Sequence, residues 1–203
     1  MTEQTLPALI LASKSQTRAD MLRRSGLGFC IKQANIDEDG VKKSLISEGL
    51  SPGEIADALA DMKARSVSAD HGDALVIGAD QILVKGRKIF SKAANQKEAR
   101  DILAELSGGE HQLISAAVVY HKGQPVWRVA DQVKLTVRPL SENFIESYLD
   151  VLGGDAFWSV GCYQLEGLGS QLFTKIEGDY FTVLGLPLLP LLDFLRRHGI
   201  LAT

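Results

Sequence analysis

The chain has 203 residues, enough to bury a substantial core in one large domain or two small ones. Its composition is that of an ordinary soluble globular protein. A formal net charge of −3, with no basic stripe between aromatic residues, argues against polymeric nucleic acid as a partner but leaves a single nucleotide open. The most apolar stretch, residues 184–195, is shorter than the roughly 20 residues of a membrane helix and contains two prolines and an aspartate, so no membrane contact is expected.

The first residues and the cysteines favour a cytoplasmic protein. The chain begins MTEQTLPALILAS, without a basic segment before its short apolar run, which argues against a secretory signal. Cys30 and Cys162 stand far apart, with no CxxC spacing and no histidine at metal-ligand spacing. We therefore expect two buried, reduced thiols.

The N-terminal part predicts a strand, a helix and a second strand. Residues 8–12 (ALILA) form a short apolar strand. Polar SKSQTR and amphipathic ADMLRRSG then predict a helix that Gly26 ends. Residues 28–34 (GFCIKQA) alternate between apolar and polar residues and predict the second strand.

The stretch from residue 51 to 70 carries the clearest helix signals. Ser51 is a suitable N-cap, Pro52 suits the first turn, and Glu54 completes a capping box. The segment that follows, DALVIGADQILV at residues 73–84, predicts a buried strand.

Strands and helices continue to mix in the second half. The pattern predicts a hairpin return at 84–90, helices at 95–108 and 141–153, two strands within 111–137, a glycine-rich loop at 161–172 and a C-terminal helix at about 187–198. Because hairpins occur beside crossovers, we expect an α/β fold with a mixed twisted sheet flanked by helices. No clear linker divides residues 1–203, so we expect a single domain that could form two lobes around a cleft.

The segment LASKSQTR, residues 11–18, is a candidate phosphate site. A strand end, hydroxyl groups, cations and a helix start follow one another, which is how backbone N–H groups and hydroxyls are presented to an anion. The residues that could hold the phosphate are Ser13, Lys14, Ser15 and, through a bidentate contact, Arg18. A simple N-cap with solvated charges is the alternative, and neither GxxxxGKS nor GxGxxG is present.

Asp80 and Gln81 interrupt an otherwise apolar strand. A carboxylate there must lose its water unless it meets a cation, a metal or hydrogen-bond donors. Asp80 is therefore a candidate catalytic base or metal ligand, or else a structural aspartate paired with a lysine. Lys92, beyond the hairpin, and Lys63, on the preceding helix, could both reach it. Glu38, in the short motif IDE, is a further acidic candidate that is weak in isolation.

Residues 163–180 predict a glycine-rich loop whose backbone can approach a ligand closely. Glu166 and Glu177 lie within it, and its regularly placed apolar residues indicate that the loop is packed rather than loose.

In their order along the chain, these stretches resemble the Maf family of nucleoside triphosphate pyrophosphatases, once named for a link to septum formation. The similarity runs from Leu9 to Leu195. LILASKSQTR resembles the family's LILASxSPRR, IDE its acidic motif, ALADMKA its LAxxKA, GADQILV its GADT or GADQ, FSKAANQKEARDIL its GKP...EA, LSGGEH its LSGxxH, and LEGLGSQLFTKIEGDYFTVLGLPL its C-terminal signature. Any one motif is weak, whereas the ordered set is specific.

The resemblance implies a fold of the Maf/ITPase type with a deep cleft, a homodimer, and hydrolysis of a nucleoside triphosphate to the monophosphate and pyrophosphate with Mg²⁺ or Mn²⁺. By position it implies a catalytic set of Asp80, Lys92, Lys63 and Glu38, of which Asp80 and Glu38 would also bind the metal. It implies a substrate-binding set of Ser13, Ser15, Thr17, Arg18, Gln81 and Glu166. The serines lack a triad partner in the sequence, so no covalent nucleophile is expected.

Two positions favour one branch of this family. A branch that prefers dTTP and UTP has GADT and a glutamine before GLG, whereas a branch that prefers 7-methyl-GTP has DQ and a glutamate. Gln81 and Glu166 resemble the second branch, and a carboxylate can accept from N1–H and N2–H₂ of a guanine edge. Thr17 departs from it, because that branch has a tryptophan there. The dTTP/UTP preference is the alternative.

Further departures leave other classes open. The family's SPRR reads SQTR, and its GKP motif reads FSKAA without the proline. A nucleotide-binding regulator of cell division with little hydrolysis, and a hydrolase of deaminated purine nucleotides, are the remaining alternatives. The presence of Asp80, Lys63 and Lys92 favours hydrolysis.

Overall fold

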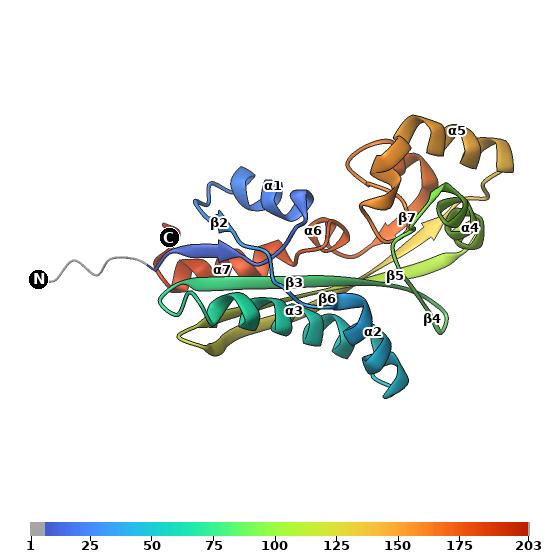
Figure 1. The fold of residues 1–203 in the computed structure, drawn as a ribbon. Helices are drawn as coiled ribbons and strands as arrows, with labels where there is room; N and C mark the ends of the chain where they lie inside the picture. Colours follow the sequence, from blue (N-terminus) through green and yellow to red (C-terminus); the bar gives the residue numbers. More distant parts are fainter. Residues whose placement is uncertain (1–6, 203) are drawn as a thin grey trace, which may run out of the picture.

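The computed structural model describes residues 7–202, which form a seven-stranded mixed sheet flanked by helices (Figure 1). The strands are β1 (Leu9–Leu11), β2 (Cys30–Ile31), β3 (Leu75–Lys85), β4 (Lys88–Phe90), β5 (Glu110–His121), β6 (Gln124–Val137) and β7 (Phe173–Glu177). Their order is β2-β1-β3-β5-β6-β7, and β4 pairs with β3. β1 is parallel to β2 and β3, whereas the other pairs are antiparallel. The expected mixed α/β fold is confirmed.

Helices cover both faces and one end of this sheet. They are α1 (Gln16–Arg24), α2 (Glu38–Ser47), α3 (Pro52–Ser68), α4 (Gln96–Leu106), α5 (Glu142–Leu152), α6 (Tyr180–Val183) and α7 (Leu188–Arg197), with 3₁₀ turns at Gly153–Phe157 and Leu168–Leu172. α1 and α7 pack on one face and α3 on the other, while α4 and α5 lie at the end near β7 (Figure 1). No helix within residues 7–202 is both long and apolar enough to cross a membrane.

β3 passes through the middle of the sheet and sends alternate side chains to its two faces. Ile77 and Ala79 join the core under α1 and α7, whereas Val76 and Ile82 join the core under α3. Because side chains alternate along a strand, Asp80 belongs to the α3 face and its neighbour belongs to the opposite face. The two consecutive polar residues, Asp80 and Gln81, therefore project from opposite faces of the sheet.

The second strand is shorter than predicted, and one cysteine is not buried. Instead of residues 28–34, only Cys30–Ile31 pair with β1. β2 is short because its partner strand β1 has only three residues, after which the chain turns into α1. The expectation that both thiols are buried was therefore wrong for Cys30, which is exposed at the sheet edge, and right for Cys162.

The prediction also missed α2, α6 and β7. No residue of α2 is fully buried, although Val41 and Leu45 pack against the core, and all residues of β7 but Phe173 are exposed, so the hydrophobic signal of both elements is weak. The prediction of a loop without regular structure at residues 163–180 was wrong, because the segment contains a 3₁₀ turn and β7. The expected packing of the segment is confirmed by Leu172, which is 1% exposed in the core beneath α4 and α5.

Candidate functional site

Helix α3 approaches β3 closely because Gly78 has no side chain. A Cβ at Gly78 would overlap the carbonyl oxygen of Ala60 and lie 2.6 Å from the backbone nitrogen of Ala64. Lys63 lies on α3 between these contacts, and Asp80 follows Gly78 by two residues on the same face of β3. The close packing of helix and strand therefore brings the lysine to the aspartate.

Lys63 lies between two carboxylates. Its Nζ is 2.6 Å from Oδ1 of Asp80 and 2.6 Å from Oε2 of Glu38. Lys63 and Asp80 are 5% and 9% exposed, whereas the Glu38 side chain, at the first residue of α2, is 46% exposed. Two anionic partners offset the desolvation of the buried ammonium, and the three groups together carry one net negative charge. Asp80 is thus both paired with a lysine and located next to a second carboxylate.

The loop after β1 combines an N-cap with a buried arginine. Ser15 caps α1 by accepting from the backbone N–H of Arg18 at 3.3 Å, and Ser13 Oγ accepts from the backbone N–H of Ser15 at 3.2 Å. Arg18 Nη1 donates to Ser13 Oγ at 3.2 Å and to Ala79 O at 3.0 Å, while its Nε donates to Gly185 O at 2.7 Å. These contacts commit part of the guanidinium to the protein itself, so Arg18 fixes the loop against β3 and the segment after α6. Burial lowers its pKa, against the attraction of Asp80.

Two further lysines stand beside this cluster. Lys42 on α2 donates to Phe90 O at 2.8 Å and to Ser91 Oγ at 3.3 Å. Partial burial lowers the pKa of Lys42, although Asp80 and then Asp39 oppose this shift. Partial desolvation in the cleft and then repulsion from Arg18 lower the pKa of Lys92. The sequence analysis missed Lys42 because it missed α2, in which Lys42 stands one turn after Glu38.

All ten residues expected at the site line one cleft with a cavity of about 450 Å³, a usual size for a small-molecule site. They are Ser13, Ser15, Thr17, Arg18, Glu38, Lys63, Asp80, Gln81, Lys92 and Glu166. Lining residues that the sequence analysis did not single out include Asp39, Lys42, Ser91, Trp158 and Gln164. Glu177 lies instead on β7, where it pairs with Lys175 at 2.9 Å, and it does not line this cleft.

Gln81 points away from Asp80 and ties β3 to α6. Its Nε2 lies 3.0 Å from Ser115 Oγ, from Thr182 O and from Val183 O. Two of these partners are carbonyls, which only accept, so the amide nitrogen must face them. A base in the cleft could meet only the carbonyl oxygen of this amide as a free group.

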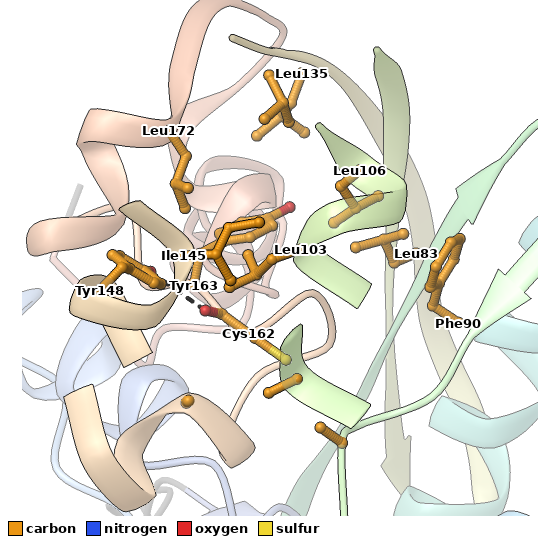
Figure 2. Packing of buried hydrophobic residues seen from close by; sticks show 14 of the residues in the cluster. Leu83, Phe90, Leu103, Leu106, Leu135, Ile145, Tyr148, Cys162, Tyr163 and Leu172 are labelled. Atoms are coloured by element: carbon orange, nitrogen blue, oxygen red, sulfur yellow. Dashed lines mark hydrogen bonds between the residues drawn. The ribbon is translucent and has the colours of Figure 1, made fainter. Parts of the chain in front are cut away.

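Cys162 and Tyr163, which precede Glu166 by a few residues, belong to the core beneath α4 and α5 (Figure 2). The Tyr148 hydroxyl donates to the carbonyl of Cys162 at 3.2 Å, drawn as a dashed line in Figure 2. Tyr163 is hydrogen-bonded to Nε2 of His111 at 2.7 Å and also lines the cleft. Cys162 has φ 59°, a left-handed conformation that is unusual for a residue with a side chain. The buried anchors hold this strained turn in place.

The acidic side chains fit a divalent cation only in part. Asp80 and Glu38 are oxygen donors of the type that Mg²⁺ and Mn²⁺ prefer. Among residues 7–202, however, no three histidine, cysteine, aspartate or glutamate side chains gather into a metal-binding group. A cation would therefore need oxygen ligands from elsewhere to complete its coordination.

The chain is similar to known proteins over nearly all of its length. It is 50% identical to a nucleoside triphosphate pyrophosphatase of Caulobacter vibrioides over 98% of this chain and 100% of that protein. It is 48% identical to a 7-methyl-GTP pyrophosphatase of Rhizobium meliloti over 95% of this chain and 97% of that protein. A solved nucleoside-triphosphatase (dITP/XTP pyrophosphatase) of Mycobacterium abscessus is 15% identical, and the match covers 66% of this chain and 75% of that chain with a TM-score of 0.36. The family of Maf-like proteins matches residues 8–198, and the chain therefore belongs to that family.

Proposed function

We propose that this chain hydrolyses nucleoside triphosphates to the monophosphate and pyrophosphate with the help of a divalent cation. The observation that carries the proposal is the buried Lys63 between Asp80 and Glu38, inside a cleft that also collects Lys42 and Lys92. A triphosphate needs cations along its phosphates and a base for the attacking water, and this set contains both. The names of the relatives support the same enzyme class.

The cleft residues divide the work of the reaction. Lys42, Lys92 and the hydroxyl groups of the loop after β1 bind the phosphates and neutralise their charge. Asp80 accepts the proton of a water that attacks the α-phosphorus. The new P–O bond forms as the bond from the α-phosphorus to the bridging oxygen breaks, and pyrophosphate leaves. Lys63 holds Asp80 and Glu38 side by side and offsets their repulsion.

Asp80 and Glu38 are the residues that would hold Mg²⁺ or Mn²⁺. When bound, the ion would supply further charge neutralisation on the triphosphate. Mg²⁺ is commonly held by one or two carboxylates together with substrate phosphates, which suits a site with two carboxylates.

Glu166 favours a guanine base of the 7-methyl-GTP type over uracil or thymine. A carboxylate accepts from both N1–H and N2–H₂ of guanine, whereas the Watson–Crick edge of uracil has one donor between two acceptors. Relatives named 7-methyl-GTP pyrophosphatase in Rhizobium meliloti and Bartonella quintana, 48% and 47% identical, support this choice. We further propose that the enzyme works in the cytoplasm as a homodimer.

Pyrophosphate release from a panel of 7-methyl-GTP, GTP, UTP, dTTP, ITP and XTP with Mg²⁺ or Mn²⁺ tests the proposal. We expect 7-methyl-GTP to be hydrolysed best, and Asp80→Asn to lose nearly all activity. The matched control is Asp193→Asn, which removes an exposed carboxylate of α7 outside the cleft. A wild-type protein inactive on the whole panel would refute the enzyme, and a preference for UTP or dTTP would refute the role of Glu166.

A further inference from the structure

Trp158 is an exposed aromatic side chain in the wall of the cleft. It is 64% exposed, and among the large apolar side chains exposed in residues 7–202 it alone also lines the cleft. Leaving an indole in water forgoes a large hydrophobic gain, because aromatic side chains bury about 150–250 Å² when covered. Because Trp158 lines a cavity that can hold a ligand, a bound ligand could cover its exposed ring.

The ring has no aromatic partner within the described part of the chain. The other tryptophan, Trp127, is half-buried and stacks on Phe194 with ring centroids 5.3 Å apart. Trp158 makes no such pair in residues 7–202. Because Trp158 is 64% exposed, its ring can be reached by a planar ligand.

The backbone on both sides of Trp158 is fixed. Its N–H donates to Asp155 O at 3.2 Å, at the end of the 3₁₀ turn Gly153–Phe157. The next residue, Ser159, donates through Oγ to Tyr163 O at 2.7 Å. Because both bonds form without ligand, little ordering of the backbone is needed for binding.

The chemistry of the cleft differs between its parts. Lys42 and Lys92 supply charge for phosphates, whereas Trp158 and Leu165 supply apolar surface, and Glu166 lines the same cleft. The base is the planar, partly apolar part of a nucleotide, and aromatic side chains stack on bases. A purine that carries a positive charge should bind most tightly, because it is attracted both to the face of the Trp158 ring and to the carboxylate of Glu166.

Resting on the proposed function, we infer that Trp158 stacks on the base of the substrate and, with Glu166, selects a cationic purine over a neutral purine or a pyrimidine. Trp158 is a specificity residue in this scheme and takes no part in bond breaking.

Fluorescence tests the stacking with the native residue in place. In Trp127→Phe, Trp158 is the remaining tryptophan, since the chain contains two. We expect its emission to be quenched by the α,β-methylene analogue of 7-methyl-GTP at lower concentrations than by those of GTP and UTP. Binding of the 7-methyl-GTP analogue by calorimetry without any change in emission would overturn the inference.

Kinetics separates this inference from the proposed activity. Trp158→Ala should raise KM for 7-methyl-GTP about 5- to 100-fold, with a smaller effect for UTP and little change in kcat, whereas Trp158→Phe should recover most of the loss. Trp127→Phe is the matched control and should behave like wild type. If Trp158→Ala hydrolyses 7-methyl-GTP with an unchanged KM, the inference fails while the pyrophosphatase activity stands. If wild type hydrolyses nothing, the activity fails and the fluorescence titration still decides the inference.

Discussion

The ammonium of Lys63 donates to the carboxylate of Asp80 at 2.6 Å, and the two side chains are only 7% and 12% exposed. The pair joins helix α3 to the central strand β3 and belongs to both the core and the cleft. A buried ion pair contributes little by itself, but removing one partner leaves the other charge without compensation. Stability and function should therefore respond together at this pair.

Lys63→Met should lower the free energy of unfolding by about 3 kcal/mol, since it leaves Asp80 buried beside Glu38 with no cation between them. Urea denaturation at pH 7 measures this change. Adding Asp80→Asn should restore part of the loss, and the double-mutant cycle should give a coupling of at least about 1 kcal/mol. Additive effects of the two substitutions would show that the pair is not coupled.

Gly78→Ala should destabilise the protein by about 2 kcal/mol and reduce activity, because the new methyl group would press on backbone atoms of α3 and move Lys63 away from Asp80. Thermal unfolding and pyrophosphate release measure the two effects. Gly53→Ala on the same helix is the matched control. It has no atom within 4 Å of the added Cβ, so it should stabilise the helix slightly. Equal stability of the two variants would contradict the close approach.

Stability should fall in weak acid because of His111. Burial, and then the charge of Lys85, lowers the pKa of His111 to about 4, compared with about 6.5 in an unfolded chain. The unfolded state binds the proton first, so stability present above pH 6.5 is lost as the pH falls towards 4, by about 3 kcal/mol from this residue.

His111→Gln should show a smaller loss of stability between pH 7 and pH 4.5 than wild type, as measured by urea denaturation at each pH. Comparison with wild type removes the part due to carboxylates, which the variant shares. His121→Gln on the same strand is the control. Parallel stability curves for His111→Gln and wild type would exclude this role.

The central part of the site could be predicted because a buried charged residue requires a partner of opposite charge or hydrogen-bond donors. An aspartate inside an apolar strand needs a partner, and the preceding helix offers Lys63 on the face that packs against β3. Gln81 was also visible as a break. Its hydrogen-bond partners, however, depend on α6, a helix of four residues that carries no periodic signal and supplies the carbonyls that bind its amide.

Site residues on exposed or irregular segments could not be predicted from the sequence. Lys42 lies on a short helix that contributes only the partly buried Val41 and Leu45 to the core, so its hydrophobic pattern is too weak to indicate which of its side chains face the cleft. Trp158 follows a 3₁₀ turn, and its exposure depends on how residues 153–163 pack against the core. Such positions are set by tertiary contacts rather than by local sequence.

Mn²⁺ should bind the free protein weakly and the protein–triphosphate complex tightly. Asp80 and Glu38 already neutralise Lys63, and no third acidic, histidine or cysteine side chain in residues 7–202 completes a metal site with them. Calorimetry of Mn²⁺ with and without an α,β-methylene triphosphate measures the difference, for which we expect at least tenfold, about 1.4 kcal/mol. Glu38→Gln should reduce the enhancement. Equally tight binding to the free protein would mean that the resident side chains suffice.

Lys42→Met should raise KM for the nucleotide about tenfold and leave the stability almost unchanged. The ammonium stands beside the Lys63 cluster on an exposed helix, so its loss removes charge from the phosphate site without opening the core. Lys43→Met is the matched control, because the neighbouring lysine is exposed on the same helix and does not line the cleft. Steady-state kinetics at two salt concentrations measures the effect, which should shrink at high salt as screening weakens the attraction. An identical KM in both variants would show that Lys42 only secures the carbonyl of Phe90 and does not bind the phosphates.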